Sequence, residues 1–282
     1  MSGIQPAGAL IIGGLGHIGR GIVRALAGTG ARLIVHDVAV EASAGRDAAA
    51  RGWNSDLRLP ELAEQARAAG AAAVDYALFD LADPHATATG CRQILAEHRV
   101  DIVVAAAGLQ STAPVAEMSR AVWDRILAVN LSSVFDLMQA FLPPMADRGY
   151  GRFISIASVH GLVASTNKPA YVAAKHGLIG LTRVAALEYA AAGSVEQGGV
   201  TVNAICPGWV ETPLIEPQIQ ARMAADGADR AAAAEALLST KMPSGRFVTA
   251  EQIGALTVLL CQPQMHALTG AALPVDGGWT AQ

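Results

Sequence analysis

Short apolar runs, separated by stretches of helical character, recur along most of this chain. Strands of a parallel sheet are buried on both faces and read as continuous apolar runs, and each needs a crossover to reach the next strand. The alternation therefore predicts an α/β fold: a single domain, residues 1–282, with a doubly wound parallel sheet of seven strands and helices on both faces. The runs cover residues 9–13, 31–37, 74–79, 100–108, 152–157, 200–206 and 271–275.

The composition suits a sheet that is buried on both faces. Of the 282 residues, 52% are hydrophobic and only 16% are charged, which favours a large core or substantial interfaces between subunits. The net charge of -4 at pH 7 gives no basic surface for a nucleic acid, so no such partner is expected. Cys91, Cys206 and Cys261 lie far apart in the sequence, and this spacing predicts neither a disulfide framework nor a metal site.

The first residues give no sign of a targeting segment. They lack the basic stretch and the apolar stretch of a signal peptide. No run of about eighteen uninterrupted apolar residues predicts a membrane span. We therefore expect a soluble, cytoplasmic protein without a membrane partner.

A glycine-rich turn follows the first apolar run. Gly14, Gly16 and Gly19 fit the pattern G-x-G-x-x-G between an expected strand and an expected helix over residues 20–26. Such glycines permit a tight turn and a close approach to a pyrophosphate, and the helix N-terminus offers N–H donors to it. The pattern can also be an ordinary glycine-rich turn. In its strand–turn–helix setting it predicts a Rossmann-like dinucleotide site.

The second apolar run ends in an acid, Asp37, eighteen residues after Gly19. A carboxylate there can accept hydrogen bonds from both ribose hydroxyls and would repel a 2′-phosphate, which favours NAD over NADP. Asp80 follows the third run, at the end of the sheet where the adenine of the cofactor could lie.

A polar loop and a new helix follow the run 152–157. Tyr171 and Lys175 share one face of this helix, because residues four apart are neighbours there. A fixed positive charge favours the phenolate and moves the pKa of a tyrosine, about 10 when free, towards neutral pH. Ser158, at the end of the strand, can hydrogen-bond the same reacting oxygen. The bare pair is more often a tyrosine at the core margin, but the preceding strand and the nucleotide-binding pattern favour catalysis.

Together these features resemble the short-chain dehydrogenase/reductase family over essentially the whole chain. Asn130, Pro207-Gly208 and Asp276-Gly-Gly278 also fall in the family's order. His17 departs from the usual Thr-Gly-x-x-x-Gly-Ile-Gly, and Ala105-Ala-Ala-Gly108 replaces the usual Asn-Asn-Ala-Gly. The resemblance implies NAD as cofactor, bound by Gly13, Leu15, His17, Ile18, Asp37, Asp80, Leu81, Ala107, Gly108, Tyr171, Lys175, Pro207, Gly208, Val210 and Thr212.

The resemblance also implies the catalytic roles. Tyr171 would take the hydroxyl proton as hydride leaves the substrate, and Ser158 would fix the reacting oxygen. Lys175 would lower the pKa of Tyr171 and hold the nicotinamide ribose, while Asn130 would position a water that links Lys175 to solvent. No metal is expected, and the family implies a homotetramer.

Within the family, the stretches 157–165, 171–177, 203–214 and 276–279 are most similar to members that act on D-3-hydroxybutyrate, a small acid. The matching positions supply a carboxylate site of Gln110, His160, Lys168 and Gln218, and Ser158, Tyr171 and Trp209 complete the substrate site. Each has a plainer interpretation: a solvated loop lysine, surface glutamines, or a loop histidine without a ligand. Trp209 and Trp279 could enclose the methyl end of the substrate or could belong to an interface.

Two further segments bear on function. Residues 210–245 include a polar, alanine-rich helical stretch without a core pattern and are expected to form a substrate lid. Residues 46–60, which include Trp53, are interpreted as an inserted surface loop.

The sequence thus predicts NAD-dependent interconversion of D-3-hydroxybutyrate, or a similar short 3-hydroxy acid, and acetoacetate. One alternative is a short-chain oxidoreductase of a polyol, a sugar or a longer 3-hydroxyacyl substrate. A second is a non-catalytic sensor that binds dinucleotide.

Overall fold

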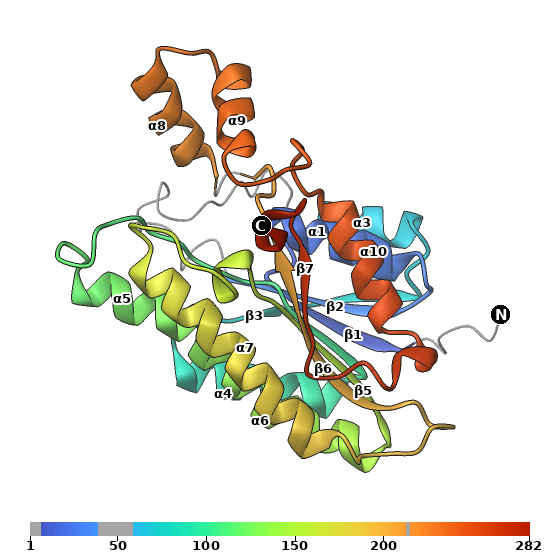
Figure 1. Cartoon of the computed structure of the whole chain (residues 1–282). Coiled ribbons are helices and arrows are strands. Elements are labelled where there is room, and N and C mark those ends of the chain that lie inside the picture. The colour runs from blue at the N-terminus through green and yellow to red at the C-terminus, as the bar shows by residue number, and fades with distance from the viewer. Residues whose placement is uncertain (1–6, 39–58, 213–214) are drawn as a thin grey trace.

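A parallel sheet lies at the centre of the computed structural model, which describes residues 7–38, 59–212 and 215–282 (Figure 1). The predicted insertion at 46–60, with Trp53, lies outside these residues except for its last two. In the described part of the chain, seven strands pair in the order β3-β2-β1-β4-β5-β6-β7, and all pairs are parallel. The strands are β1 (Gly8–Ile12), β2 (Arg32–Asp37), β3 (Ala73–Leu78), β4 (Ile102–Ala105), β5 (Tyr150–Ile156), β6 (Gly199–Pro207) and β7 (Ala272–Val275).

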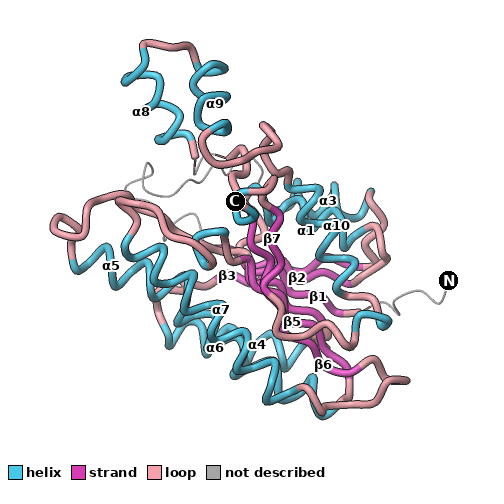
Figure 2. Tube along the Cα trace, viewed as in Figure 1, coloured by secondary structure: helices cyan, strands magenta, loops and turns pink. Residues whose placement is uncertain are grey.

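Helices cover both faces of this sheet, as predicted (Figures 1 and 2). In β1, Ala9 and Ile11 pack on one face with residues of α1, α3 and α10, whereas Leu10 and Ile12 pack on the other with α4, α6 and α7. The strand is buried on both faces, so its sequence is continuously apolar. The helices around the sheet are α1 (His17–Ala27), α3 (Leu59–Ala68), α4 (Pro84–Glu97), α5 (Arg120–Leu127), α6 (Ser133–Asp147), α7 (Pro169–Tyr189) and α10 (Ala250–Leu260).

The strand order reverses between β1 and β4, and this point positions the site. β1 lies between β2 and β4, so the chain leaves β1 and β4 in opposite directions and a crevice opens at their carboxyl ends. The apolar run 100–108 was expected to be strand throughout. β4 ends at Ala105 because residues 106–108 leave the sheet to line this crevice.

One long helical span passes beneath the crevice. A π-helical turn, Ala128–Ser132, divides this span into α5 and α6. In the described residues this span, Arg120–Asp147, is the one helix whose length and mean hydropathy of 1.4 would allow a membrane crossing. Half of that window is buried inside the protein, as in the core helix of a soluble protein.

Two helices project beyond the carboxyl ends of the strands, α8 (Glu216–Asp226) and α9 (Arg230–Ser239) (Figure 1). From the sequence, this segment was predicted to lack a core pattern, and that prediction was incomplete. Ile215, Ile219, Ala233 and Ala234 form a small core of their own, against which Trp209 packs. Four apolar positions, two of them alanines, are too few to give a recognisable period in an alanine-rich segment.

The contact between α1 and α10 gives a test of the packing. A Cβ on Gly21 would lie 2.6 Å from both the Cβ and the carbonyl oxygen of Ala250. We expect Gly21→Ala to lower the free energy of unfolding by about 1–3 kcal/mol, measured by urea denaturation. Helix propensity alone predicts a gain of about 1 kcal/mol, so a stabilised variant would contradict this close packing.

Candidate active site

The turn after β1 is built on two glycines that cannot carry a side chain. Gly13 has a φ of +76°, and a Cβ there would lie 2.7 Å from the backbone of Ala107. A Cβ on Gly19 would lie 2.1 Å from the carbonyl oxygen of Gly13. His17, the departure from the family pattern, begins α1 after Gly16, in a helical conformation that any residue adopts. The histidine therefore leaves the turn intact.

Asp37 lies at the end of β2 behind this turn. Its Oδ2 accepts a hydrogen bond from the N–H of Leu15 at 2.9 Å, and its Oδ1 accepts one from the N–H of Val38 at 2.9 Å. Burial raises the pKa of this carboxyl to about 6, so it is ionised at neutral pH. A buried carboxylate beside a glycine turn fits the ribose of a dinucleotide, with lone pairs left to accept its hydroxyls.

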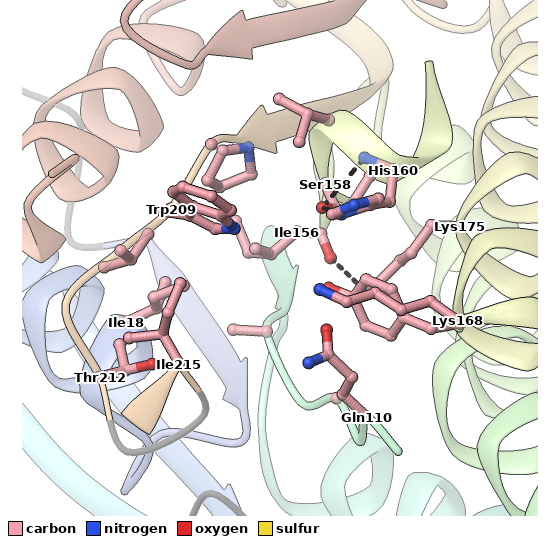
Figure 3. Close-up of a pocket in the computed structure, with 18 of the residues that line it drawn as sticks. Ile18, Gln110, Ile156, Ser158, His160, Lys168, Lys175, Trp209, Thr212 and Ile215 are labelled. Atoms are coloured by element: carbon pink, nitrogen blue, oxygen red, sulfur yellow. Dashed lines mark hydrogen bonds between the residues drawn. The ribbon is translucent and has the colours of Figure 1, made fainter. Parts of the chain in front are cut away.

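A pocket opens where β4, β5 and β6 end (Figure 3). Fifteen of the predicted site residues line it: Ile18, Ala107, Gly108, Gln110, Ser158, His160, Lys168, Tyr171, Lys175, Pro207, Gly208, Trp209, Val210, Thr212 and Gln218. Seven predicted residues do not: Gly13, Leu15, His17, Asp37, Asp80, Leu81 and Asn130. The lining also includes residues that the sequence analysis missed, namely Ala106, Ile156, Ala157, Val159 and Ile215. These are apolar and carry no chemical signal, but their places next to strand ends could have indicated them.

Ser158, Tyr171 and Lys175 meet at the base of this pocket. Ser158 follows β5, and its Oγ accepts a hydrogen bond from the N–H of His160 at 3.1 Å. Tyr171 lies in the first turn of α7 and Lys175 one turn later, with its Nζ 5.7 Å from the centroid of the Tyr171 ring. The Nζ of Lys175 donates to the carbonyl of Ile156 at 2.7 Å. This bond ties α7 to the end of β5.

Burial controls the protonation of both groups. It raises the pKa of the Tyr171 phenol, and a hydrogen bond with Ser158 lowers that pKa without reversing the direction. Burial lowers the pKa of Lys175 to about 8. The sequence predicted that Lys175 would lower the pKa of Tyr171; that effect stays a prediction, and the net shift of this pKa is upward. The cause is desolvation: burial disfavours the charged phenolate more than the hydrogen bond with Ser158 favours it.

Asn130 lies in the π-helical turn and holds the loop that follows β4. Its Nδ2 donates to the carbonyl of Leu109 and its Oδ1 accepts from the N–H of Leu109, both at 2.8 Å. A Cβ on Gly108 would lie 3.7 Å from the Oδ1 of Asn130 and 3.8 Å from the Nζ of Lys175. Asn130 is therefore close to Lys175, although its side chain is occupied by the loop. A π-turn inside a helix is rare and often marks a functional site.

Lys168 and Gln218 join across the other end of the pocket. The Nζ of Lys168 donates to the Oε1 of Gln218 at 3.1 Å, which connects the loop before α7 to α8. Burial lowers the pKa of Lys168 to about 8, and its side chain is 7% exposed. Figure 3 shows the amide of Gln110 and the ammonium of Lys168 pointing into the same part of the pocket. A small anion between them would meet donors from three segments.

His160 stands between the catalytic and the polar ends. Its Nε2 lies 2.8 Å from the Oγ of Ser165, and its Nδ1 lies 3.4 Å from the Oγ of Ser158. Burial, with the charges of Lys168 and Lys241, lowers its pKa to about 3, so the imidazole is neutral.

Aromatic rings close the pocket beside His160. The centroid of the Trp279 ring lies 5.5 Å from that of His160 and 4.9 Å from that of Trp209. The rings meet edge to face, an arrangement that aromatic pairs favour. Trp279 is 5% exposed and supports the wall that Trp209 forms.

Comparison with known proteins agrees with this geometry. A family model described as enoyl-(acyl carrier protein) reductase matches residues 15–280. The D-beta-hydroxybutyrate dehydrogenase of Cupriavidus necator is 40% identical over 275 residues, which are 97% of this chain and 98% of that protein. The protein of the same name from Rhizobium meliloti is 36% identical over the same shares.

A solved structure shares the fold over nearly the whole length. The gluconate 5-dehydrogenase from Burkholderia cenocepacia, in complex with NADP and tartrate, has a TM-score of 0.80 and 28% sequence identity. The match covers 99% of this chain and 97% of that one.

Proposed function

Because this chain belongs to the short-chain dehydrogenase/reductase family and is an oxidoreductase of that type, we propose that it interconverts D-3-hydroxybutyrate and acetoacetate with NAD. A similar short 3-hydroxy acid would use the same site. The observation that carries the proposal is the convergence of four hydrogen-bonding groups beside the catalytic trio: Gln110, His160, Lys168 and Gln218. They come from three segments: the loop after β4, the connection between β5 and α7, and α8. Lys168 adds a positive charge, which suits a carboxylate.

In this proposal the catalytic trio handles one proton. A bound NAD would supply the acceptor for the hydride that leaves C3 of the hydroxy acid. Tyr171 takes the hydroxyl proton at its phenolic oxygen, or returns it to the keto oxygen in the reverse direction. Ser158 hydrogen-bonds the same oxygen and holds it at the phenol. The raised pKa of Tyr171 favours the protonated form, which donates the proton when the keto acid is reduced, so oxidation of the hydroxy acid is favoured at alkaline pH.

The cofactor preference rests on Asp37. Its buried carboxylate is ionised at neutral pH, and a second negative charge from a 2′-phosphate would be repelled there. The glycine turn supports a dinucleotide of either kind, since Gly13 and Gly19 leave no room for a side chain. Asp37 therefore favours NAD, although the solved gluconate dehydrogenase carries NADP.

A sugar acid is the second candidate substrate. The gluconate 5-dehydrogenase acts on an acid that also has a carboxylate, so the polar end of this pocket would accept it. The aromatic side favours the shorter substrate, because Trp209, which packs against Trp279, offers the pocket one unpaired N–H where a sugar acid needs partners for several hydroxyls. A methyl group, as in 3-hydroxybutyrate, needs none.

The segment at about 210–245 acts as a lid in this proposal. Gln218 brings α8 to the polar end of the pocket through its bond to Lys168. At the base of the segment, Arg230 forms ion pairs with Glu211 and Glu216 at 3.1 and 3.0 Å. A substrate carboxylate that replaced the bond between Lys168 and Gln218 would hold α8 over the bound acid.

We further propose a soluble, cytoplasmic homotetramer. Phe135 on α6 and Val184 and Leu187 on α7 are 48%, 53% and 80% exposed. Three large apolar side chains on adjacent helices favour a contact between subunits.

The substrate proposal is tested by NADH formation at 340 nm. We expect the protein to turn over the D enantiomer of 3-hydroxybutyrate with NAD at least about tenfold faster than the L enantiomer or gluconate. With the D enantiomer, turnover should also be at least about tenfold faster with NAD than with NADP. Tyr171→Phe is the matched control and should lower kcat by about 100-fold or more. Protein that binds NADH but turns over neither enantiomer would refute the assignment and favour a dinucleotide sensor.

The role of Lys168 predicts a pH dependence of KM. The lysine carries its charge below its pKa of about 8 and loses it above, so the KM for D-3-hydroxybutyrate should rise as the pH passes 8. Lys168→Arg should keep the KM flat over this range, since arginine stays protonated. Lys168→Met should raise the KM about tenfold or more at pH 7. A KM in Lys168→Met equal to that of the wild type would remove Lys168 from the site.

The assembly is tested by light scattering of the purified protein. We expect the mass of a tetramer for the wild type, and a smaller species for Leu187→Glu, because burying a carboxylate in an apolar contact is unfavourable. Val195→Glu is the control, since Val195 is 65% exposed in the loop after α7. An unchanged mass in the Leu187 variant would exclude this face.

A further inference from the structure

The chain contains only three lysines, and two of them line the pocket. Of its twenty basic residues, seventeen are arginines and three are lysines: Lys168, Lys175 and Lys241. Lys168 and Lys175 line the pocket. Lys241 follows α9, and its Nζ lies 5.9 Å from the centroid of the Trp279 ring.

Arginines and lysines do different work in this molecule. Arginines form the structural ion pairs, for example Arg24 with Glu251 and Arg99 with Asp101. For the lysines, no carboxylate among the residues that the structure describes lies within ion-pair distance. The two lysines of the pocket donate to neutral oxygens instead. Arginine suits fixed bidentate pairs, whereas lysine is a compact point charge. The lysine ammonium groups are therefore left to interact with a charged ligand.

The backbone around Lys241 is fixed. Its N–H donates to the carbonyl of Leu238 at 3.0 Å, and its own carbonyl accepts from the Nε2 of Gln282 at 3.4 Å. The distance from its Nζ to the Trp279 ring is within the range of a cation–π contact. The ammonium is therefore held beside the aromatic wall while its side chain stays exposed to solvent.

The charge of Lys241 reaches into the pocket. After burial, Lys168 and Lys241 are the two largest influences that lower the pKa of His160. Acids of the adjoining segments are engaged in other contacts: both oxygens of Asp276 accept hydrogen bonds from the turn that carries Trp279, and Glu211 and Glu216, before and at the start of α8, pair with Arg230. Two cations from different segments thus act on the same imidazole.

We propose that Lys241 is a specificity-determining residue that attracts an anionic substrate into the pocket by its charge, without contacting the bound carboxylate. This rests on the proposed function, in which the substrate is a small acid. The whole chain has a net charge of -4 and would repel such an anion, so a local positive field at the site raises the rate of productive encounter. Lys168 is largely buried and receives the carboxylate, whereas Lys241 is exposed and acts at longer range.

The test compares three variants on D-3-hydroxybutyrate at low and high ionic strength. Lys241→Gln should lower kcat/KM about two- to sixfold at low ionic strength with kcat unchanged, and the difference should vanish at about 0.5 M salt. Lys241→Arg should behave as the wild type. Arg246→Gln is the matched control, because it removes an exposed cation from the same loop that is not among the influences on the pKa of His160.

The methyl ester of the same acid separates charge from packing. Lys241→Gln should leave kcat/KM for this neutral substrate unchanged. An equal loss for acid and ester, or a loss in Lys241→Arg as large as in Lys241→Gln, would mean that Lys241 only supports Trp279, and would overturn the proposal. If the wild type turns over the acid and Lys241→Gln has the same kcat/KM at low ionic strength, the Lys241 proposal is overturned while the proposed function stands. A wild type inactive on the acid would refute the proposed function, and this inference with it.

Discussion

One hydrogen bond, from the Nζ of Lys175 to the carbonyl of Ile156, connects the parts on which the site depends. It joins the helix that carries Tyr171 to the end of the strand that precedes Ser158. Both ends are buried, so the bond is not weakened by competition with water. The spacing of serine, tyrosine and lysine is thereby set by secondary structure rather than by flexible loops. The pocket residues from later segments then assemble around a fixed reaction centre.

The same burial that fixes the geometry also sets the charges. It raises the pKa of Tyr171 and lowers those of Lys168 and Lys175 to about 8. Each group is therefore shifted towards its neutral form, which is the expected response to desolvation. A site of this kind can move a proton at moderate pH. Its two lysines stay charged only while the pH is below their pKa of about 8. The chemistry and the pH range follow from one physical cause.

The sequence was enough to predict the seven-strand sheet, because strands buried on both faces are continuously apolar. It also predicted fifteen of the residues that line the pocket, among them Ser158, Tyr171 and Lys175, which follow a strand end and a helical repeat. It could not predict the direction of the Tyr171 pKa, which depends on burial by distant residues. The hydrogen bond between Lys168 and Gln218 joins residues fifty positions apart, and the contact of Lys241 with Trp279 joins two further separate segments. Contacts of this kind leave no local pattern.

The position of the third lysine follows from the cost of burying the first two. A cation that is buried deeply enough to bind a carboxylate loses hydration. It therefore loses its proton more easily, as the lowered pKa of Lys168 shows. Adding a second buried cation beside it would increase this cost and would also destabilise the first by repulsion. An exposed ammonium beside Trp279 keeps its hydration and still contributes its field. In the proposed roles, the division between a buried lysine that binds the carboxylate and an exposed lysine that attracts it is the arrangement that desolvation favours.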